Sequence, residues 1–320
     1  MSKRIDAYEK ITGQIIEALE AGYIPWEKPW NRSGLGYSEA PRSWRGQIYR
    51  GFNTMLLGFY QDRFGYKDNR WITYAAAKKI GGHVKAGEKS ATVTFWSNTF
   101  KHGNACKIRG RKGSYRIACD NLGKNLECQK FVTLKYYFVF NVDQCENLDE
   151  KQVPPMDPVD IDAVENTFDP IEAGEAVATA YIEREKLGHV TGSEAFYTPA
   201  KDTITMPPKE SFKTNNSYYS TLFHELGHST GHKSRLNRKD GAEQIMFGST
   251  KYAKEELVAE LTNAFISDYT GVSNKIEDSQ RVAYIGSWLK KFKDDSKMVI
   301  VASGQAQKAA DLIIGEEATS

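Results

Sequence analysis

Residues 224–228 have the types and the spacing that bind a divalent metal ion. They read His224-Glu225-Leu226-Gly227-His228, a histidine pair four residues apart with a glutamate after the first. On a helix, positions i and i+4 share a face, so both imidazoles can reach one cation. Glu225 lies about 100° further round such a helix, where its carboxylate can take a proton from a water molecule at the metal. The competing interpretation is an ordinary charged helix face.

A third ligand is needed, because a catalytic zinc ion takes three protein ligands and keeps one position open. The metzincin arrangement would need a histidine at position 234, but that residue is Ser234. Further along, Glu256 and Glu260 stand four residues apart on a second predicted helix. A ligand from such a helix is the gluzincin arrangement, and we predict Glu256 as the third ligand, with Glu255 as its rival. Glu260 is then expected to hold a ligand imidazole in place.

Because H-E-x-x-H on a helix is typical of metallopeptidases, two neighbouring residues are candidates for stabilising the oxyanion that develops during peptide hydrolysis. His232 lies just past the first helix, and Tyr252 opens the second. The segment Ala195–Met206 alternates enough to be an edge strand along which an extended substrate aligns. A core strand explains the same alternation equally well.

Helical periodicity and strand-forming segments place these motifs in a mainly helical second half. A short β region is expected around Ala195–Tyr197 and Thr203–Met206, with a turn at Pro199–Asp202. The helices that we expect cover 171–187, 217–230, 252–269, 278–292 and 303–315.

The first half mixes helices and strands. Helices are expected over 5–21, from Asn53 to Tyr60 and from Thr73 to Ile80. The segments Ala91–Trp96 and Phe131–Phe140 are β-branched and aromatic, which is typical of strands. We therefore expect an α+β protein.

A Lys/Arg-rich excursion over residues 97–130 separates those two strands and looks like an extended hairpin or insertion. It carries one histidine and three cysteines: His102, Cys106, Cys119 and Cys128. A second metal site is conceivable there, but the excursion contains no C-x-x-C pair, so ordinary cytosolic thiols are the preferred interpretation. A basic hairpin that contacts phosphate is the simpler idea.

Charge is divided unevenly between the two halves of the chain. Residues 1–150 hold 24 Lys and Arg against 15 Asp and Glu, whereas residues 151–320 hold 19 against 26, so that +9 and −7 sum to the net charge of +2. Such asymmetry points to a polyanionic partner for the basic half. A solvated basic face is the alternative.

The bulk composition bounds the class of protein. With 320 residues, the chain exceeds what one hydrophobic core usually serves. We predict a first domain over 1–145, an acidic, proline-bearing linker over 146–164 and a second domain over 165–320. No apolar run approaches the length of a membrane span, and the four cysteines form no disulfide framework. We expect a cytoplasmic protein with no membrane partner.

Several longer segments are similar to one known family. The stretch from Tyr218 to His232 resembles the zincin-like C-terminal domain of ArdC-type antirestriction proteins. The first half resembles that family's other domain, a single-stranded-DNA-binding module also found at the front of TraC-type primases. The segments that carry the second resemblance are Ile24–Trp26, Lys28–Trp30, Tyr49–Asn53, Trp71–Tyr74, Gly81-Gly82 and Lys85–Glu88.

The resemblance implies a mobile-element protein that binds single-stranded DNA and shields incoming DNA from host restriction. Its second domain would be a peptidase loaded with Zn²⁺ or another divalent transition metal, and a host restriction component is a possible protein substrate. The alternative is a non-enzymatic DNA-protection protein whose metal is structural.

Single strands are bound by basic grooves with aromatic platforms, and the first half interleaves both residue types. Trp71 is expected to be buried instead. The residues that we select as DNA contacts are Trp44, Arg45, Tyr49, Arg50, Lys28 and Arg32.

Overall fold

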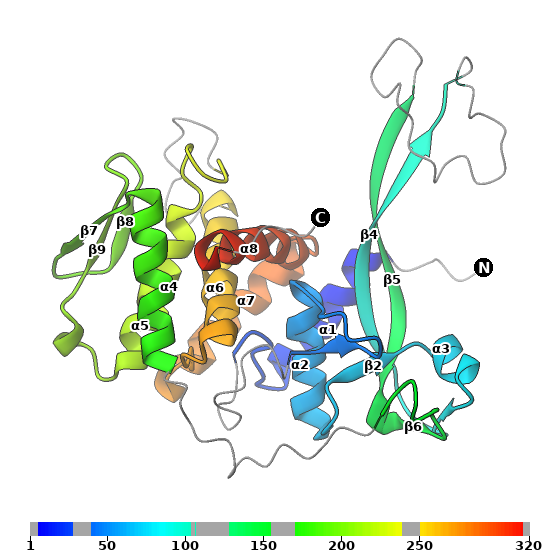
Figure 1. The fold of residues 1–320 in the computed structure, drawn as a ribbon. Coiled ribbons are helices and arrows are strands. Elements are labelled where there is room, and N and C mark those ends of the chain that lie inside the picture. Colours follow the sequence, from blue (N-terminus) through cyan, green and yellow to red (C-terminus); the bar gives the residue numbers. More distant parts are fainter. Residues whose placement is uncertain are drawn as a thin grey trace.

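Two halves of the chain lie side by side, and a long hairpin projects from one of them (Figure 1). The structure, a computed structural model, describes residues 6–27, 40–103, 106, 128–154, 170–238 and 250–315. No helix within these ranges is long and apolar enough to cross a membrane. Helices and separate small sheets together make an α+β protein, which confirms the predicted class.

The first half builds three helices around a four-stranded sheet. Its helices are α1 (Ala7–Glu20), α2 (Phe52–Phe64) and α3 (Tyr74–Lys79). The sheet has the order β1-β2-β5-β4, and its strands are β1 (Arg42–Ser43), β2 (Arg70–Ile72), β5 (Gln129–Asn141) and β4 (Ala91–Lys101). A separate pair is formed by β3 (His83–Val84) and β6 (Cys145–Glu146). Thr73 caps α3, because its hydroxyl accepts a hydrogen bond from the Ala76 N–H.

Strand β4 runs past its predicted end, into the segment that the sequence predicts as an extended hairpin or insertion. The antiparallel register runs without interruption from Ala91 opposite Val139 to Lys101 opposite Gln129. The predicted strand end at Trp96 was therefore wrong by five residues. Polar residues such as Ser97 and Asn98 do not end this strand, because they lie in a stretch of it, residues 94–99, in which no side chain is buried.

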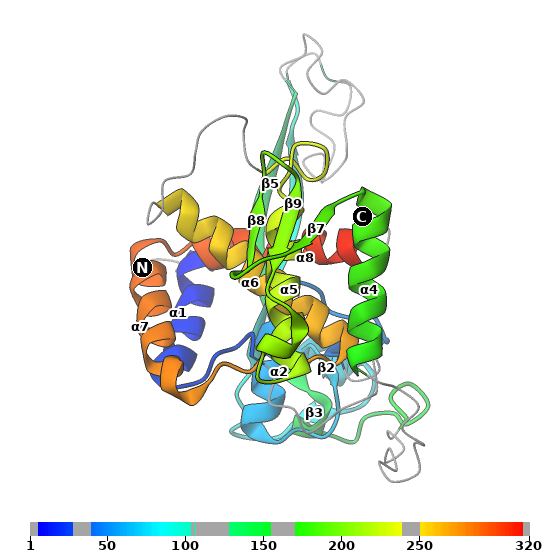
Figure 2. The same cartoon turned by 90° about the vertical axis from the view of Figure 1, so that its left-hand side faces the viewer.

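The second half is a helical bundle with a small sheet along one side (Figure 2). Its helices are α4 (Pro170–Glu185), α5 (Asn215–Ser229), α6 (Thr250–Thr270), α7 (Asp278–Asp294) and α8 (Met298–Ile314). The sheet has the order β7-β9-β8, formed by β7 (Gly188–Thr191), β9 (Thr203–Met206) and β8 (Phe196–Thr198). Each predicted helix of this half is present, with ends shifted by a few residues.

One hydrophobic core spans both halves. Ile11 and Ile15 of α1 belong to the same buried cluster as Phe292 of α7 and Ile300 of α8, and α1 lies beside α7 in Figure 2. Each of these four side chains is at most 4% exposed. The helices of the second half therefore pack directly on the first half.

The predicted linker begins within a packed region. Glu146 pairs with His83 in the β3–β6 ladder, and Val153 is buried in a cluster with Ile72 and Ile80. The residues up to 154 thus extend the first half, and residues 155–169 lie outside the described part of the chain.

Candidate metal centre

Three side chains converge between α5 and α6. The Nε2 atoms of His224 and His228 are 3.0 Å apart. Glu256 of α6 places one carboxylate oxygen 3.6 Å from the Nε2 of His224 and the other 3.4 Å from the Nε2 of His228. One ligand atom from each residue lies within 4.8 Å of the others.

This geometry fits a divalent cation. Bonds of about 2.0–2.2 Å in a tetrahedral site place neighbouring ligand atoms about 3.3–3.5 Å apart, which is close to the separations among His224, His228 and Glu256. Two imidazoles and one carboxylate are also donors that zinc and related transition metals accept. The side chains are 13–25% exposed, so the centre borders on solvent.

Gly227 allows the two helices that carry the ligands to approach closely. A Cβ added to this glycine would lie 3.1 Å from the Cα of Ala259 and 3.2 Å from the Cβ of Thr262, both on α6. These contacts are tighter than ordinary van der Waals distances. The absence of a side chain at Gly227 therefore brings Glu256 within reach of the histidines.

Glu255, the rival ligand, lies on the other side of the His228 ring. Its carboxylate is 3.7 Å from Nδ1 of His228, whereas Glu256 faces Nε2. The Arg238 guanidinium donates to Glu255 at 2.8 Å and to the Gly227 carbonyl at 2.8 Å. This arrangement favours Glu256 as the ligand and lets Glu255 orient His228. No sequence signal identified Arg238, because its spacing to α6 follows no motif.

Glu260 connects the centre to the first half. It accepts a hydrogen bond from the Tyr284 hydroxyl, and burial raises its pKa. The indole N–H of Trp26 in turn donates to the Tyr284 hydroxyl at 2.8 Å. Glu260 lies close enough to His224 for its charge to raise the pKa of that imidazole. Neither Tyr284 nor Trp26 was selected for this role from the sequence.

Glu225 and Tyr252 lie close enough to this centre to act on it electrostatically. Glu225 is 8% exposed, and its charge contributes to raising the pKa of both His224 and Tyr252. Burial, together with Glu256, raises the pKa of Tyr252 to about 12. Burial alone would lower the pKa of His224, but the hydrogen bond with Glu256 and the charges of Glu260 and Glu225 raise it to about 9.

His232 is held by residues outside this cluster. Its Nδ1 accepts a hydrogen bond from the Ser234 N–H at 3.3 Å and lies 3.9 Å from a carboxylate oxygen of Asp202. Of the two oxyanion candidates, Tyr252 is the one hydrogen-bonded to Glu256, the candidate third ligand. Lys291 of α7 was not selected from the sequence. Burial lowers its pKa, and the charges of Glu256 and Glu260 oppose that effect.

The β region that we considered as a substrate edge is divided between two positions in the sheet. β9 is the central strand, paired on both sides, so Thr203–Met206 cannot serve as an edge. β8 is an edge strand, and the Phe196 side chain is 46% exposed. The edge interpretation therefore holds only for Phe196–Thr198.

The selected DNA contacts have different surroundings. Arg45 is exposed, with its guanidinium 4.7 Å from the centroid of the half-buried Trp44 ring. Tyr49 packs against the cluster around Trp71, and burial raises its pKa. Trp71 is 1% exposed, as predicted. Lys28 and Arg32 lie outside the described residues.

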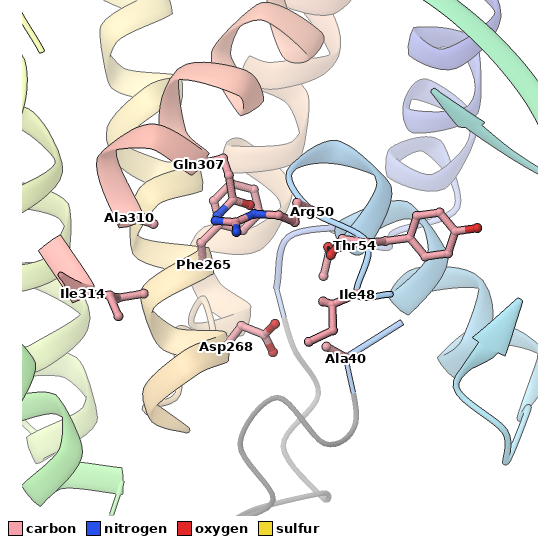
Figure 3. Close-up of a pocket in the computed structure, with 10 residues that line it drawn as sticks. Ala40, Ile48, Arg50, Thr54, Phe265, Asp268, Gln307, Ala310 and Ile314 are labelled. Carbon is pink, nitrogen blue, oxygen red and sulfur yellow. Dashed lines mark hydrogen bonds between the residues drawn. The ribbon is translucent and has the colours of Figure 1, made fainter. Parts of the chain in front are cut away.

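Arg50 faces the second half. Figure 3 shows its side chain reaching into a pocket toward Gln307 and Phe265. The guanidinium forms an ion pair with Asp311 of α8, whose side chain is 8% exposed, and the neighbouring Gly51 N–H donates to Gln307 at 2.7 Å. Arg50 thus joins the two halves.

Exposed aromatic side chains line the β4–β5 hairpin. Sequence reasoning did not select these residues as DNA contacts. Trp96 is 51% exposed, and Phe95, Phe131 and Phe138 are 44–45% exposed. Phe95 stands directly opposite Lys135 in the register. Because side chains alternate along a strand, Phe95 and Phe131 share one face while Trp96 and Phe138 share the other. Solvent-facing aromatics beside lysines are typical of a nucleic-acid-binding surface.

In the comparison with known proteins, the two halves of the chain match separate family models. One matching family model is described as the N-terminal domain of anti-restriction factor ArdC and covers residues 5–140. A second is described as a zincin-like metallopeptidase and covers residues 176–305. Fold and site therefore define a zincin-like metallopeptidase domain that follows an ArdC-type N-terminal domain.

Two crystal structures of the antirestriction ArdC protein from plasmid R388 resemble the whole chain. The metal-free one is 33% identical, covers 97% of each chain and has a TM-score of 0.64. The Mn(II)-bound one is 33% identical, covers 98% of this chain and 99% of its own, and has a TM-score of 0.67. The chain belongs to the ArdC family of antirestriction proteins.

Curated relatives match over nearly the whole chain. The uncharacterized protein y4eC of Sinorhizobium fredii is 30% identical over 96% of this chain and 91% of its own length. Two Escherichia coli proteins named DNA primase TraC are 33% and 32% identical over 97% of this chain. This chain spans only 20% and 27% of the length of those two primases.

Proposed function

We propose that the first half of this protein binds single-stranded DNA and that its second half is a metal-dependent peptidase, which together protect incoming DNA from host restriction. The observation that carries the peptidase assignment is the convergence of His224, His228 and Glu256 beside an intact Glu225. The proposal places this action in the cytoplasm, with a protein of the restriction machinery as the substrate class.

The metal that we propose for His224, His228 and Glu256 is Zn²⁺ or another divalent transition metal. A relative with 33% identity has been solved with Mn(II) bound, and an His₂Glu set is equally typical of zinc. A bound cation of this kind polarises a peptide carbonyl and lowers the pKa of water.

The chain's own residues then have distinct roles. Glu225 is positioned to accept a proton on its carboxylate and to pass it to the leaving amine. The Tyr252 hydroxyl, which hydrogen-bonds Glu256, is placed to donate to a developing oxyanion. Glu255 and Arg238 orient His228 through its Nδ1 side. The edge strand β8 offers backbone groups along which an extended peptide could align.

The test is a cleavage assay with the metal-loaded full chain and its Glu225→Gln variant. Candidate substrates are restriction-endonuclease subunits, presented with and without single-stranded DNA. We expect Glu225→Gln to retain the metal, measured by elemental analysis, and to lose cleavage by at least about 100-fold, because general-base catalysis contributes about 10²–10⁴. Glu194→Gln, an exposed control, should cleave like the wild type. Undiminished cleavage by Glu225→Gln would refute the role of Glu225.

The second candidate is a DNA-protection protein in which the metal is structural. The hydrogen bonds from Trp26 to Tyr284 and from Tyr284 to Glu260 favour it, because they tie the metal centre to the first half. Under this alternative, Glu225→Gln retains full protection of DNA against restriction in cells. Loss of protection in the same variant supports the peptidase instead.

A further inference from the structure

A second group of metal-binding side chains lies at the outer end of the β4–β5 hairpin. Lys101 and Gln129 are the last paired residues, so His102 and Cys128 leave the ladder opposite each other. Cys106 lies next to them, with its Sγ 3.4 Å from Nδ1 of His102. One ligand atom from each of the three residues lies within 4.8 Å of the others.

Both cysteines are buried at this end of the hairpin. Cys106 is 6% exposed and Cys128 is 5% exposed. The three hydrophobic clusters found among the described residues include neither of them. An isolated two-stranded hairpin is marginally stable in water, and small units without a core are commonly held by a metal or a disulfide. Both cysteines are thiols here, which leaves the metal as the natural link.

The backbone at this end is arranged as in thiolate sites. The buried Gly103 N–H donates to the Sγ of Cys128 at 3.4 Å, which stabilises negative charge on sulfur. The Cys106 N–H donates to the Gly103 carbonyl at 3.0 Å. This hydrogen bond holds Cys106 near His102. The H-x₃-C spacing that results falls within the range typical of zinc loops.

We propose that His102, Cys106 and Cys128 form a structural site for a thiolate-preferring divalent cation of the zinc class, separate from the centre on α5 and α6. Bonds of about 2.3 Å to sulfur and 2.0 Å to nitrogen place S and N about 3.5 Å apart in a tetrahedral site, close to the separation between Cys106 and His102. Soft thiolates select zinc over magnesium, calcium or manganese. Binding deprotonates both thiols, so that two protons go to solvent and the two thiolates balance the dication.

Cobalt spectroscopy of the reduced, full-length protein tests this site directly. Co²⁺ bound to thiolate gives a sulfur-to-metal charge-transfer band, whereas His224, His228 and Glu256 offer no sulfur. We expect the band in the wild type at stoichiometric Co²⁺. A wild type that binds Co²⁺ without this band would overturn the proposal, and this measurement requires no substitution that might unfold the hairpin.

Variants identify the residues that produce the band. They also keep the test independent of the proposed peptidase. His224→Ala with His228→Ala should keep the band and about one equivalent of zinc. Cys106→Ser and Cys128→Ser should each lose the band, while Cys145→Ser, which changes a thiol that donates a hydrogen bond to the Asn141 carbonyl, should keep it. Persistence of the band in the Cys106→Ser/Cys128→Ser double variant, or a disulfide between these residues in the purified protein, contradicts the site.

Discussion

Single residues decide whether the candidate metal ligands meet. Glu255 and Glu256 are adjacent, yet they face opposite ring nitrogens of His228. They differ in position because adjacent residues of a helix point about 100° apart, and Gly227 sets how closely α5 and α6 approach. Small changes at this contact therefore act on metal affinity as well as on stability.

Gly227→Ala should weaken both properties. The new Cβ presses on backbone atoms of Ala259, so α6 has to shift, and we expect a loss of about 1–3 kcal/mol in the free energy of unfolding. We also expect at least about tenfold weaker metal binding. Denaturant unfolding and metal titration measure the two effects. Gly286→Ala on α7, where a Cβ meets nothing within 4 Å, should be neutral or stabilising. Equal behaviour of the two variants would contradict this account.

At the scale of secondary-structure elements, a few polar interactions connect α5, which carries His224 and His228, to the neighbouring sheet. Arg235, which follows α5, donates to Asp202 at 3.1 Å and to the Ser229 carbonyl at 2.9 Å. Its side chain is 1% exposed. This link joins the end of the histidine-bearing helix to the turn between β8 and β9.

Asp202→Asn should destabilise the protein in a pH-dependent manner. Burial would raise the pKa of Asp202, but hydrogen bonds from Arg235 and Tyr197 and the Arg235 charge bring it below its ordinary value. The stabilisation is therefore complete above the unfolded-state pKa of about 3.9 and is lost as the pH falls through the lower folded-state pKa. We expect a loss of about 2 kcal/mol in unfolding free energy at pH 7.

Urea unfolding across a pH series measures this effect. The difference between the wild type and Asp202→Asn should be constant from pH 6 to 8 and shrink below about pH 4. Tyr197→Phe, which keeps the ion pair and removes one hydrogen bond to Asp202, should cost less. A difference in unfolding free energy that grows as the pH falls would contradict a lowered pKa of Asp202 in the folded protein.

The aromatic hairpin carries the prediction on DNA binding. Trp96→Ala and Phe131→Ala should each weaken single-strand binding by about 1–3 kcal/mol, because both rings are available for base stacking. Binding should also weaken as salt rises. Tyr74→Ala removes a similarly exposed ring from outside the hairpin and serves as the control in fluorescence-anisotropy titrations. Full affinity in both hairpin variants would show that single-stranded DNA binds elsewhere on the protein.

The long periodic elements were predictable from the sequence, as were the short helix α3 and the strands β8 and β9, but the two-residue strands were not. Helices α5 and α6 follow from apolar spacing, and with them the shared face of His224 and His228. The two-residue strands β1, β3 and β6 exist only because distant segments pair, so no local pattern marks them. Arg238 and Tyr284 were hidden for a related reason, because they lie 17 or more residues from the glutamates that they contact, which is outside any short motif.

At the scale of the whole molecule, Arg50 illustrates how context changes an interpretation. A basic residue in a glycine-bearing loop favours a DNA contact, but the structure pairs Arg50 with Asp311 across the junction of the two halves. Further links across this junction run from Thr12 to the Ser296 carbonyl and from Asn274 to the Trp26 carbonyl.

Arg50→Met should therefore reduce stability more than DNA affinity. Leaving Asp311 without its cation is expected to cost about 1–3 kcal/mol of unfolding free energy, with one cooperative transition in calorimetry because the halves share a core. Single-strand affinity and its salt slope should change little. If Arg50 contacts phosphate, the slope of log K against log salt falls by about one, and Arg45→Met provides the exposed comparison.

The shared core also limits how this molecule can be dissected. A cut after residue 145 would strip α7 and α8 from α1 and leave the inner faces of Ile11, Ile15 and Leu19 in water. Such a fragment would expose a large apolar surface. Its aggregation or non-specific binding could then be mistaken for affinity for DNA. Point substitutions in the intact chain are the sounder way to separate what each half does.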